Sequence, residues 1–145
     1  MDSAREQIND AEVLLRRVPP TSDSFQTVCD RGDGPSRAVS AAMSTRSDEE
    51  HLSCSRRRLT SPRQLLDDLR HDGIDPVGWH VCAFLVSDVR ALGLEVVFTP
   101  TDRDRGHCSI TDKNGLAFPN KKSQKLARRT RILAEGEIDQ APPRP

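Results

Sequence analysis

His107 is the residue whose position in the sequence best suits it for chemistry. It follows a charged loop, residues 102–105, and Gly106 directly before it allows close approach of another backbone. An imidazole can act as a general acid or base near neutral pH, and a cation such as Lys125 could neutralise a phosphate. This combination predicts a small His-dependent nuclease or hydrolase of the toxin type. The alternative is structural, with His107 opening a strand and bonding to the loop backbone.

Histidines and cysteines of two predicted strands form a second group of candidates. His80 and Cys82 are two positions apart, so a strand places both on one face. His107 and Cys108 are adjacent and face opposite sides. A zinc site needs four converging ligands, whereas His80, Cys82 and His107 supply at most three. The alternative is that the cysteines are small buried apolar side chains, so we expect no bound metal and no cofactor.

A run of basic residues marks the C-terminal region. The predicted helix over residues 121–134 contains no acidic residue. Leu126, Thr130 and Leu133 recur on one helix face and are expected to face the core, which leaves the cations outside. Such a surface binds phosphates with strong salt dependence, although a solvated helix face is the alternative. The predicted nucleic-acid-binding residues are Lys121, Lys122, Lys125, Arg128, Arg129 and Arg131.

The composition limits how much of the chain can fold. The 145 residues correspond to one domain, of which 34% are hydrophobic, 3% aromatic and 30% charged. The apolar residues are concentrated between residues 79 and 99. The net charge is zero, but residues 1–55 carry six arginines against ten acids, so the remainder has a net charge of +4. This asymmetry is compatible with a basic surface without requiring one.

Hydrophobic periodicity predicts an α+β domain over residues 59–135. Ser61, Pro62 and Gln64 are typical of a helix start, and Gly73 is typical of a helix end. Segments rich in valine and phenylalanine predict a short antiparallel sheet, whose last two strands form a hairpin. The predicted strands lie near 79–85, 94–99 and 107–111, and the predicted helices near 62–71, 87–92 and 121–134.

Residues 1–58 are predicted to be a weakly structured region before this domain. Apolar residues at helical spacing predict a helix over residues 4–17. Residues 20–58 contain few apolar side chains and bury too little surface to offset the entropy of ordering them, so we expect disorder there. Residues 136–145 are expected to form a disordered tail. Met43 is an alternative start of the protein.

The N-terminal sequence lacks the basic and apolar segments of a secretion signal. The longest strictly apolar stretch is residues 81–86, far short of the roughly 20 residues that a membrane span needs. We therefore expect a cytoplasmic protein that binds nucleic acid or a partner protein and does not bind a membrane. A third functional possibility is an accessory protein whose N-terminal helix docks on another protein.

Three segments of the C-terminal half resemble a family of small bacterial proteins. Residues 87–94 are followed by Gly106-His107-Cys108-Ser109-Ile110, and residues 118–127 include Lys122-Ser-Gln-Lys-Leu126-Ala127. The family is similar in having a Gly-His-x-x-Ile strand followed by a basic Lys-x-x-x-Leu-Ala helix. No activity is established for that family. The resemblance implies the domain limits 59–135 and a bacterial setting, and it assigns no catalytic residue.

Overall fold

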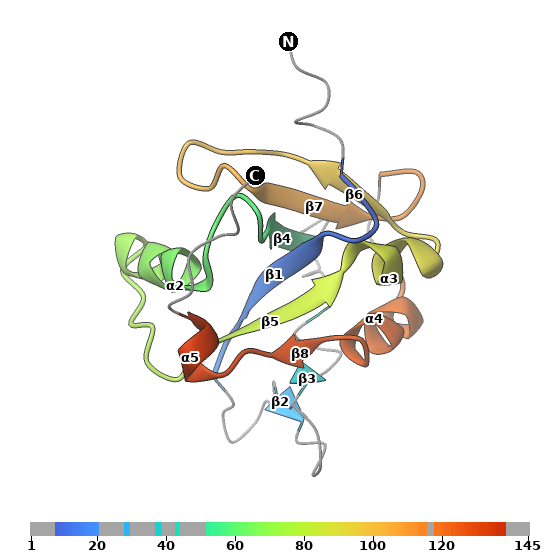
Figure 1. Ribbon diagram of the computed structural model, residues 1–145. Helices are drawn as coiled ribbons and strands as arrows, with labels where there is room; N and C mark the ends of the chain where they lie inside the picture. The colour runs from blue at the N-terminus through green and yellow to red at the C-terminus, as the bar shows by residue number, and fades with distance from the viewer. Residues whose placement is uncertain are drawn as a thin grey trace.

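A six-stranded antiparallel sheet with the order β6-β7-β4-β1-β5-β8 forms the centre of the computed structural model (Figure 1). The structure describes residues 8–20, 28–29, 37–38, 43, 52–115 and 118–138. The strands are β1 (Val13–Val18), β4 (Leu52–Arg56), β5 (His80–Leu85), β6 (Glu95–Phe98), β7 (His107–Thr111) and β8 (Arg131–Ile132). A separate pair contains β2 (Val28–Cys29) and β3 (Arg37–Ala38). The predicted α+β class and antiparallel sheet are confirmed.

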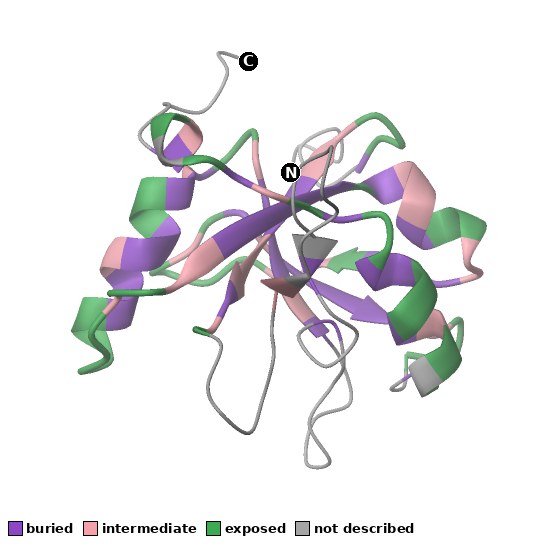
Figure 2. Cartoon of the chain, turned by 90° about the horizontal axis from the view of Figure 1, so that it is seen from below, coloured by how far each residue is buried: buried purple, intermediate pink, exposed green. Residues whose placement is uncertain are grey.

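Helices cover both faces of this sheet. One face packs against α2 (Pro62–His71) and α5 (Glu135–Ile138), and the other packs against α3 (Val86–Ala91) and α4 (Asn120–Ala127). In Figure 2 the buried residues lie along the sheet and on the inner sides of the helices. Two apolar clusters result, one on each face of the sheet. Within the described ranges, no helix has the length and apolarity to cross a membrane.

The helix predicted over residues 4–17 is wrong where the structure describes it, because residues 13–18 form strand β1. This strand lies between β4 and β5, so both of its edges are paired, and apolar clusters pack on both of its faces. Leu14 and Val18 join the cluster beside α3 and α4, while Leu15 joins the cluster beside α2. A strand buried on both faces has consecutive apolar residues, as Leu14 and Leu15 are here, whereas the helical spacing came mainly from apolar residues before Val13. Residues 4–7 lie outside the described part.

Strand β4 also lies before the predicted domain boundary at residue 59. Together, β1 and β4 extend the folded sheet into the predicted weakly structured region, residues 1–58. The sequence Leu52-Ser-Cys54-Ser alternates apolar and polar residues as a strand does, but its side chains are too small to stand out in composition. Most of the remaining predicted disorder falls on residues outside the described part and stays a prediction there. A chain that began at Met43 would lack β1.

Helix α2 agrees with its prediction at both ends. The Ser61 side chain accepts a hydrogen bond from the Gln64 N–H at 3.1 Å, and Pro62 occupies the first turn. Gly73 has a φ of 77°, the left-handed conformation that ends many helices. The hairpin of β6 and β7 is confirmed as well. Helix α3 begins at Val86, and backbone carbonyls of residues 10 and 12 bind its first N–H groups.

The predicted helix over residues 121–134 is wrong in its second half, because α4 ends at Ala127. The Thr130 hydroxyl donates to the Ala127 carbonyl at 2.7 Å and accepts from the Ala38 N–H at 2.9 Å. The chain then forms β8 along the free edge of β5, where the Leu133 N–H donates to the Val81 carbonyl at 2.9 Å. The backbone hydrogen bonds made with this edge of β5 stabilise the chain more than a further turn of α4 would.

The predicted C-terminal tail is also shorter than expected. Residues 135–138 form the single turn α5, and Ile138 is buried against α2. Burial of this side chain anchors a segment that composition alone assigns to the tail. Residues 139–145 lie outside the described part, where disorder stays a prediction.

A buried ion pair joins the segment before β1 to the end of β4. Arg56 is completely buried, and its Nε and Nη2 donate to the two Glu12 carboxylate oxygens at 2.8 and 2.9 Å. The guanidinium also lies 4.8 Å from the centre of the Phe98 ring, within the range of a cation–π contact. Burial raises the pKa of the Glu12 carboxyl, but hydrogen bonds from Arg56 and Asn9 outweigh burial and lower the pKa overall.

Gly106 lies directly against this arginine. The Arg56 N–H donates to the Gly106 carbonyl at 2.8 Å. A Cβ atom at Gly106 would lie 3.0 Å from the Arg56 carbonyl oxygen and 3.2 Å from Leu59 Cβ. The close backbone approach predicted for this glycine is therefore confirmed, and it is made by the protein's own strand β4.

We expect Glu12→Ala to lower the free energy of unfolding by about 3–5 kcal/mol, since it removes both carboxylate oxygens from a completely buried guanidinium. Asp10→Ala removes an exposed carboxylate that pairs with Arg90 and is expected to cost less than about 1 kcal/mol. Urea unfolding of both variants measures the difference. Because the folded pKa of Glu12 is lowered, the stabilisation is present above the unfolded pKa and lost as the pH falls through the folded one. Equal losses in the two variants would contradict this assignment.

The fragment of residues 59–145 is expected not to fold, because it lacks β1 and β4 from the middle of the sheet. Circular dichroism and amide proton dispersion of this fragment, compared with the full chain, measure the effect. A cooperative unfolding transition in the fragment would show instead that the other four strands form a stable sheet without the two central ones.

Candidate functional site

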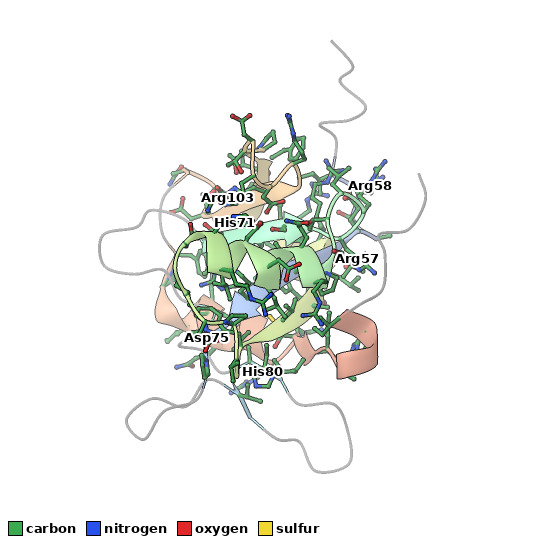
Figure 3. The ribbon with its side chains drawn as sticks, turned by 90° about the vertical axis from the view of Figure 1, so that its left-hand side faces the viewer. Arg57, Arg58, His71, Asp75, His80 and Arg103 are labelled. Carbon is green, nitrogen blue, oxygen red and sulfur yellow. The ribbon has the colours of Figure 1, made fainter. Side chains whose placement is uncertain are left out.

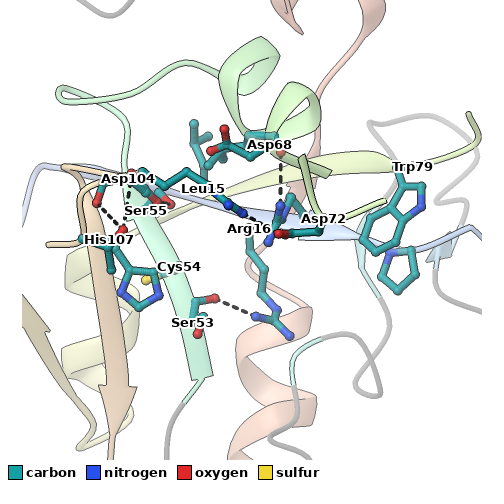
Figure 4. A pocket seen from close by; sticks show the side chains of 15 residues that line it. Leu15, Arg16, Ser53, Cys54, Ser55, Asp68, Asp72, Trp79, Asp104 and His107 are labelled. Carbon is teal, nitrogen blue, oxygen red and sulfur yellow. Dashed lines mark hydrogen bonds and ion pairs between the residues drawn. The ribbon is translucent and has the colours of Figure 1, made fainter. Parts of the chain in front are cut away.

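A cavity of about 580 Å³ opens on the sheet face that α2 covers in part (Figure 4). Apolar residues of α2 pack over the half of this face formed by β1 and β5. The neighbouring half, formed by β4 and β7, presents small polar side chains and a histidine to the cavity. The connection between β6 and β7 and the C-terminal end of α2 complete the wall. The volume is typical of small-ligand sites, which span about 300–1,000 Å³.

Strand alternation determines which side chains reach this cavity. On β4, Cys54 joins the apolar cluster of the opposite face, so Ser53 and Ser55 point toward the cavity. On β7, Cys108 joins the same cluster, so His107 points toward the cavity. The register pairs Ser55 with His107, and the two side chains are therefore cross-strand neighbours.

The surroundings of His107 determine which ring nitrogen carries the proton. Nδ1 lies 3.1 Å from the Thr99 carbonyl oxygen and 2.9 Å from the Thr99 hydroxyl. A carbonyl oxygen only accepts, so we assign the proton of the neutral ring to Nδ1 and the lone pair to Nε2. The Thr99 hydroxyl also lies 3.1 Å from the Ser109 hydroxyl. Thr99 thus holds His107 through Nδ1, which leaves the other ring nitrogen, Nε2, as the basic one.

Asp104 fixes the loop that leads into β7. Its Oδ2 accepts from the Ser55 hydroxyl at 2.5 Å, and its Oδ1 accepts from the Gly106 N–H at 3.0 Å. Its backbone carbonyl accepts from the N–H groups of Thr101, at 2.9 Å, and His107, at 3.2 Å. The Ser55 proton is therefore directed at Asp104 and not at His107, so these three residues do not form a catalytic triad.

Two consecutive arginines of β1 line the cavity. Strand β1 pairs with β4 up to Leu15, and beyond this point the Arg16 guanidinium donates to the Ser53 carbonyl at 2.6 Å (Figure 4). Arg17 donates from Nη1 to the Leu65 carbonyl of α2 at 3.3 Å. A guanidinium has five N–H groups in a planar fork, and the other four of Arg17 have no partner among the described residues.

Three carboxylates also line the cavity, and each already accepts hydrogen bonds from the protein. Both oxygens of Asp104 are engaged, as described above. Asp68 accepts from the Gln64 side chain at 2.9 Å. Asp72 forms an ion pair with Arg103, which joins the β6–β7 connection to the end of α2. Figure 3 shows Arg103 close to His71 at this end of the helix.

Several hydrogen-bond donors of the cavity have no partner among the described residues. They are the remaining N–H groups of Arg17, the indole N–H of Trp79 and the Ser53 hydroxyl. Trp79 is the one tryptophan of the chain and is half-buried at the cavity wall. Donors that face a cavity and have no acceptor within the protein favour an anionic ligand. Arginine in particular favours phosphate or carboxylate.

The structure brings His107 into the cavity, but it does not bring the predicted partners with it. Lys125 on α4 does not line the cavity. The structural alternative is also seen, since His107 opens β7 and bonds to the loop backbone at Thr99. The functional role predicted for His107 stays a prediction, and the surroundings predicted for it are not those that the structure shows.

The predicted metal ligands do not converge. Cys82 is buried in the cluster on the opposite face from His107. His80 lies at the other end of the molecule from Arg103 in Figure 3. In the part of the chain that the structure describes, no three His, Cys, Asp or Glu residues are grouped as a metal site would require.

The predicted basic surface is divided among three segments. Arg128 and Arg129 follow the end of α4, and Arg131 lies in β8. Two of these arginines have carboxylate partners: Arg129 lies 3.6 Å from Asp88, and Arg131 pairs with Glu137 at 2.8 Å. The residues that remain on α4 are Lys121, Lys122 and Lys125.

Sequence reasoning did not find most of the residues that line the cavity. Arg16 and Arg17 were assigned to a helix, and Ser53 and Ser55 to a disordered segment. The alternation of apolar and polar residues over 52–55 was the available signal. Nothing in the sequence indicated that Trp79, the one tryptophan, would lie at a cavity wall.

Comparison with known proteins adds no further constraint, since no protein family, no curated protein and no solved structure matches this chain. The resemblance to small bacterial proteins stays a prediction.

Three cysteines are excluded from the chemistry of the cavity by their burial. Cys54 and Cys108 face each other across β4 and β7, and Cys82 is buried beside them. Burial raises the pKa of the Cys82 thiol to about 12. A hydrogen bond with Cys108, together with burial, raises the pKa of Cys54 well above its ordinary value. Because the thiolate is the reactive form, these groups are poor nucleophiles.

We expect these three thiols to react with an aromatic disulfide reagent only when the protein unfolds. The Cys29→Ser variant serves as the background, since the Cys29 side chain lies outside the described part. The release of the coloured thiol at mildly alkaline pH, with and without urea, measures the reaction. Rapid modification without urea would mean that at least one of the three sulfurs is accessible in the folded protein.

Proposed function

We propose that the protein binds single-stranded nucleic acid and holds one phosphate-bearing nucleotide in the cavity between the sheet and α2. The observation that carries the proposal is the set of unused Arg17 donors in a cavity where each carboxylate already accepts at least one hydrogen bond from the protein. A guanidinium binds phosphate oxygens through two parallel hydrogen bonds. The cavity volume is suited to a single small ligand.

Trp79 supports a nucleotide in preference to inorganic phosphate. Its ring is half-buried at the cavity wall and packs against the apolar cluster of α2. An aromatic side chain in such a place is a platform on which a base stacks, and stacking contributes about 1–3 kcal/mol per base. Bases of a duplex are already stacked and paired, so a cavity of this kind favours an unpaired strand.

The lysines of α4 offer a second surface on the same molecule. Lys121, Lys122 and Lys125 make no ion pair with the described residues. Their side chains attract phosphates in the solvent-exposed manner that depends strongly on salt. They do not line the cavity, so the two surfaces can be separated by mutation.

Binding of a labelled single-stranded RNA at low salt is expected to weaken about tenfold or more in Arg17→Gln and in Trp79→Leu, as loss of a bidentate phosphate contact or of stacking predicts. The triple variant Lys121→Gln, Lys122→Gln, Lys125→Gln is the matched control and is expected to change the affinity less than either. Fluorescence anisotropy measures affinity, and circular dichroism confirms folding.

The opposite order of effects would move the binding surface to α4. No binding by the parent protein at low salt would overturn the proposed function altogether. Binding of duplex as tight as binding of the single strand would contradict the assignment of the cavity.

A further inference from the structure

The cavity contains a side chain that can act as a base, His107, but no protein nucleophile that a neighbouring base activates. The Ser55 hydroxyl donates to Asp104 at 2.5 Å and does not face a general base. Cys54 borders the cavity, but it is 3% exposed, it belongs with Cys108 to the apolar cluster on the other face, and its pKa is raised. His107 is the one cavity residue that presents a basic nitrogen, Nε2, without a partner among the described residues. A nucleophile activated here must therefore come from the ligand or from water.

We propose that His107 is the general base of RNA cleavage in this cavity, with the 2′-hydroxyl of the bound nucleotide as the nucleophile. This inference rests on the proposed function, because it requires a strand held by Arg17 and Trp79. A ribonucleotide has a 2′-hydroxyl next to the phosphodiester. This hydroxyl takes the place of a protein nucleophile. The substrate class is thus single-stranded RNA, and DNA of the same sequence is a ligand that is not cleaved.

The reaction balances with the groups present. His107 Nε2 takes the proton of the 2′-hydroxyl while the 2′-oxygen forms a bond to phosphorus. The bond from phosphorus to the 5′-oxygen breaks, and this oxygen takes a proton from water. The hydroxide that results removes the proton from His107 and restores the base. The products are a 2′,3′-cyclic phosphate and a 5′-hydroxyl end, and no oxidant or second substrate is consumed.

The geometry behind His107 fits this role. The Thr99 carbonyl and hydroxyl, at 3.1 and 2.9 Å from Nδ1, hold the ring in the tautomer whose lone pair is on Nε2. The Ser109 hydroxyl, 3.1 Å from that of Thr99, supports it in turn. Thr99 is a positioning residue. Arg17, which holds the phosphate, stabilises the charge on it as the 2′-oxygen attacks.

The test compares a short RNA with a DNA of the same sequence that carries a single ribonucleotide, and with the all-DNA strand, in the presence of a metal chelator. The full-length protein is expected to cleave the chimera only after its ribonucleotide and to bind the DNA without cleaving it. His107→Ala and His107→Gln are expected to slow cleavage by about 10²- to 10⁴-fold with affinity changed less than about twofold. Added imidazole is expected to restore cleavage in His107→Ala.

Two further variants test the position of the ring. Thr99→Val is expected to slow cleavage without weakening binding, whereas Thr99→Ser keeps the hydroxyl and is expected to cleave at nearly the parent rate. A merely structural role of Thr99 would affect binding and cleavage together and would not be rescued by serine.

Each outcome has a separate meaning. Binding of RNA without cleavage overturns the role of His107 and leaves the proposed function in place. Cleavage that His107→Ala does not slow, or that lacks cyclic phosphate ends, also overturns the inference. Absence of binding overturns both proposals.

Discussion

The buried pair of Arg56 and Glu12 is the interaction on which both the sheet and the cavity depend. Taking two charges out of water costs several kcal/mol for each ion, and this cost is offset only when the geometry of the pair is good. Here the guanidinium meets both carboxylate oxygens and lies over the Phe98 ring. One side chain therefore connects the start of β1, the end of β4 and the end of β6. Since the Arg56 backbone also binds Gly106, the pair fixes the loop that presents His107.

Strands β4 and β7 contribute to the core and to the cavity at the same time. Cys54 and Cys108 close the apolar cluster on one face, and their immediate neighbours Ser55 and His107 line the cavity on the other. This arrangement gives the site a rigid floor, because any shift of these strands would also disturb the packed face. A one-residue change of register would exchange the two sets of side chains. The polar half of the sheet is thus positioned by the apolar half.

The sequence predicted those elements that are marked by residues within or directly beside them. Helix α2 has its cap, its proline and its final glycine in the sequence, and β5 has a dense apolar pattern, so both were predicted closely. Elements defined by distant partners were not predicted. The segment before and within β1 has helical spacing and forms a strand because it pairs with β4 and β5, and α4 ends early because the following residues pair with the edge of β5. His107 could be predicted from its residue type and its loop, whereas Arg16, Arg17 and Ser53 become neighbours of the cavity only through strand pairing.

The central position of β1 has a consequence for how the chain assembles. Its partners lie far along the sequence, since Val13 pairs with Leu85 and Leu14 pairs with Arg56. Such a topology has a high contact order, and loop closure must be completed before the pairing stabilises the chain. During synthesis, the apolar residues of β1 leave the ribosome long before β5 exists. The nascent chain therefore carries an unpaired, hydrophobic strand while the residues between β1 and β5 are synthesised, which makes early association with a chaperone advantageous.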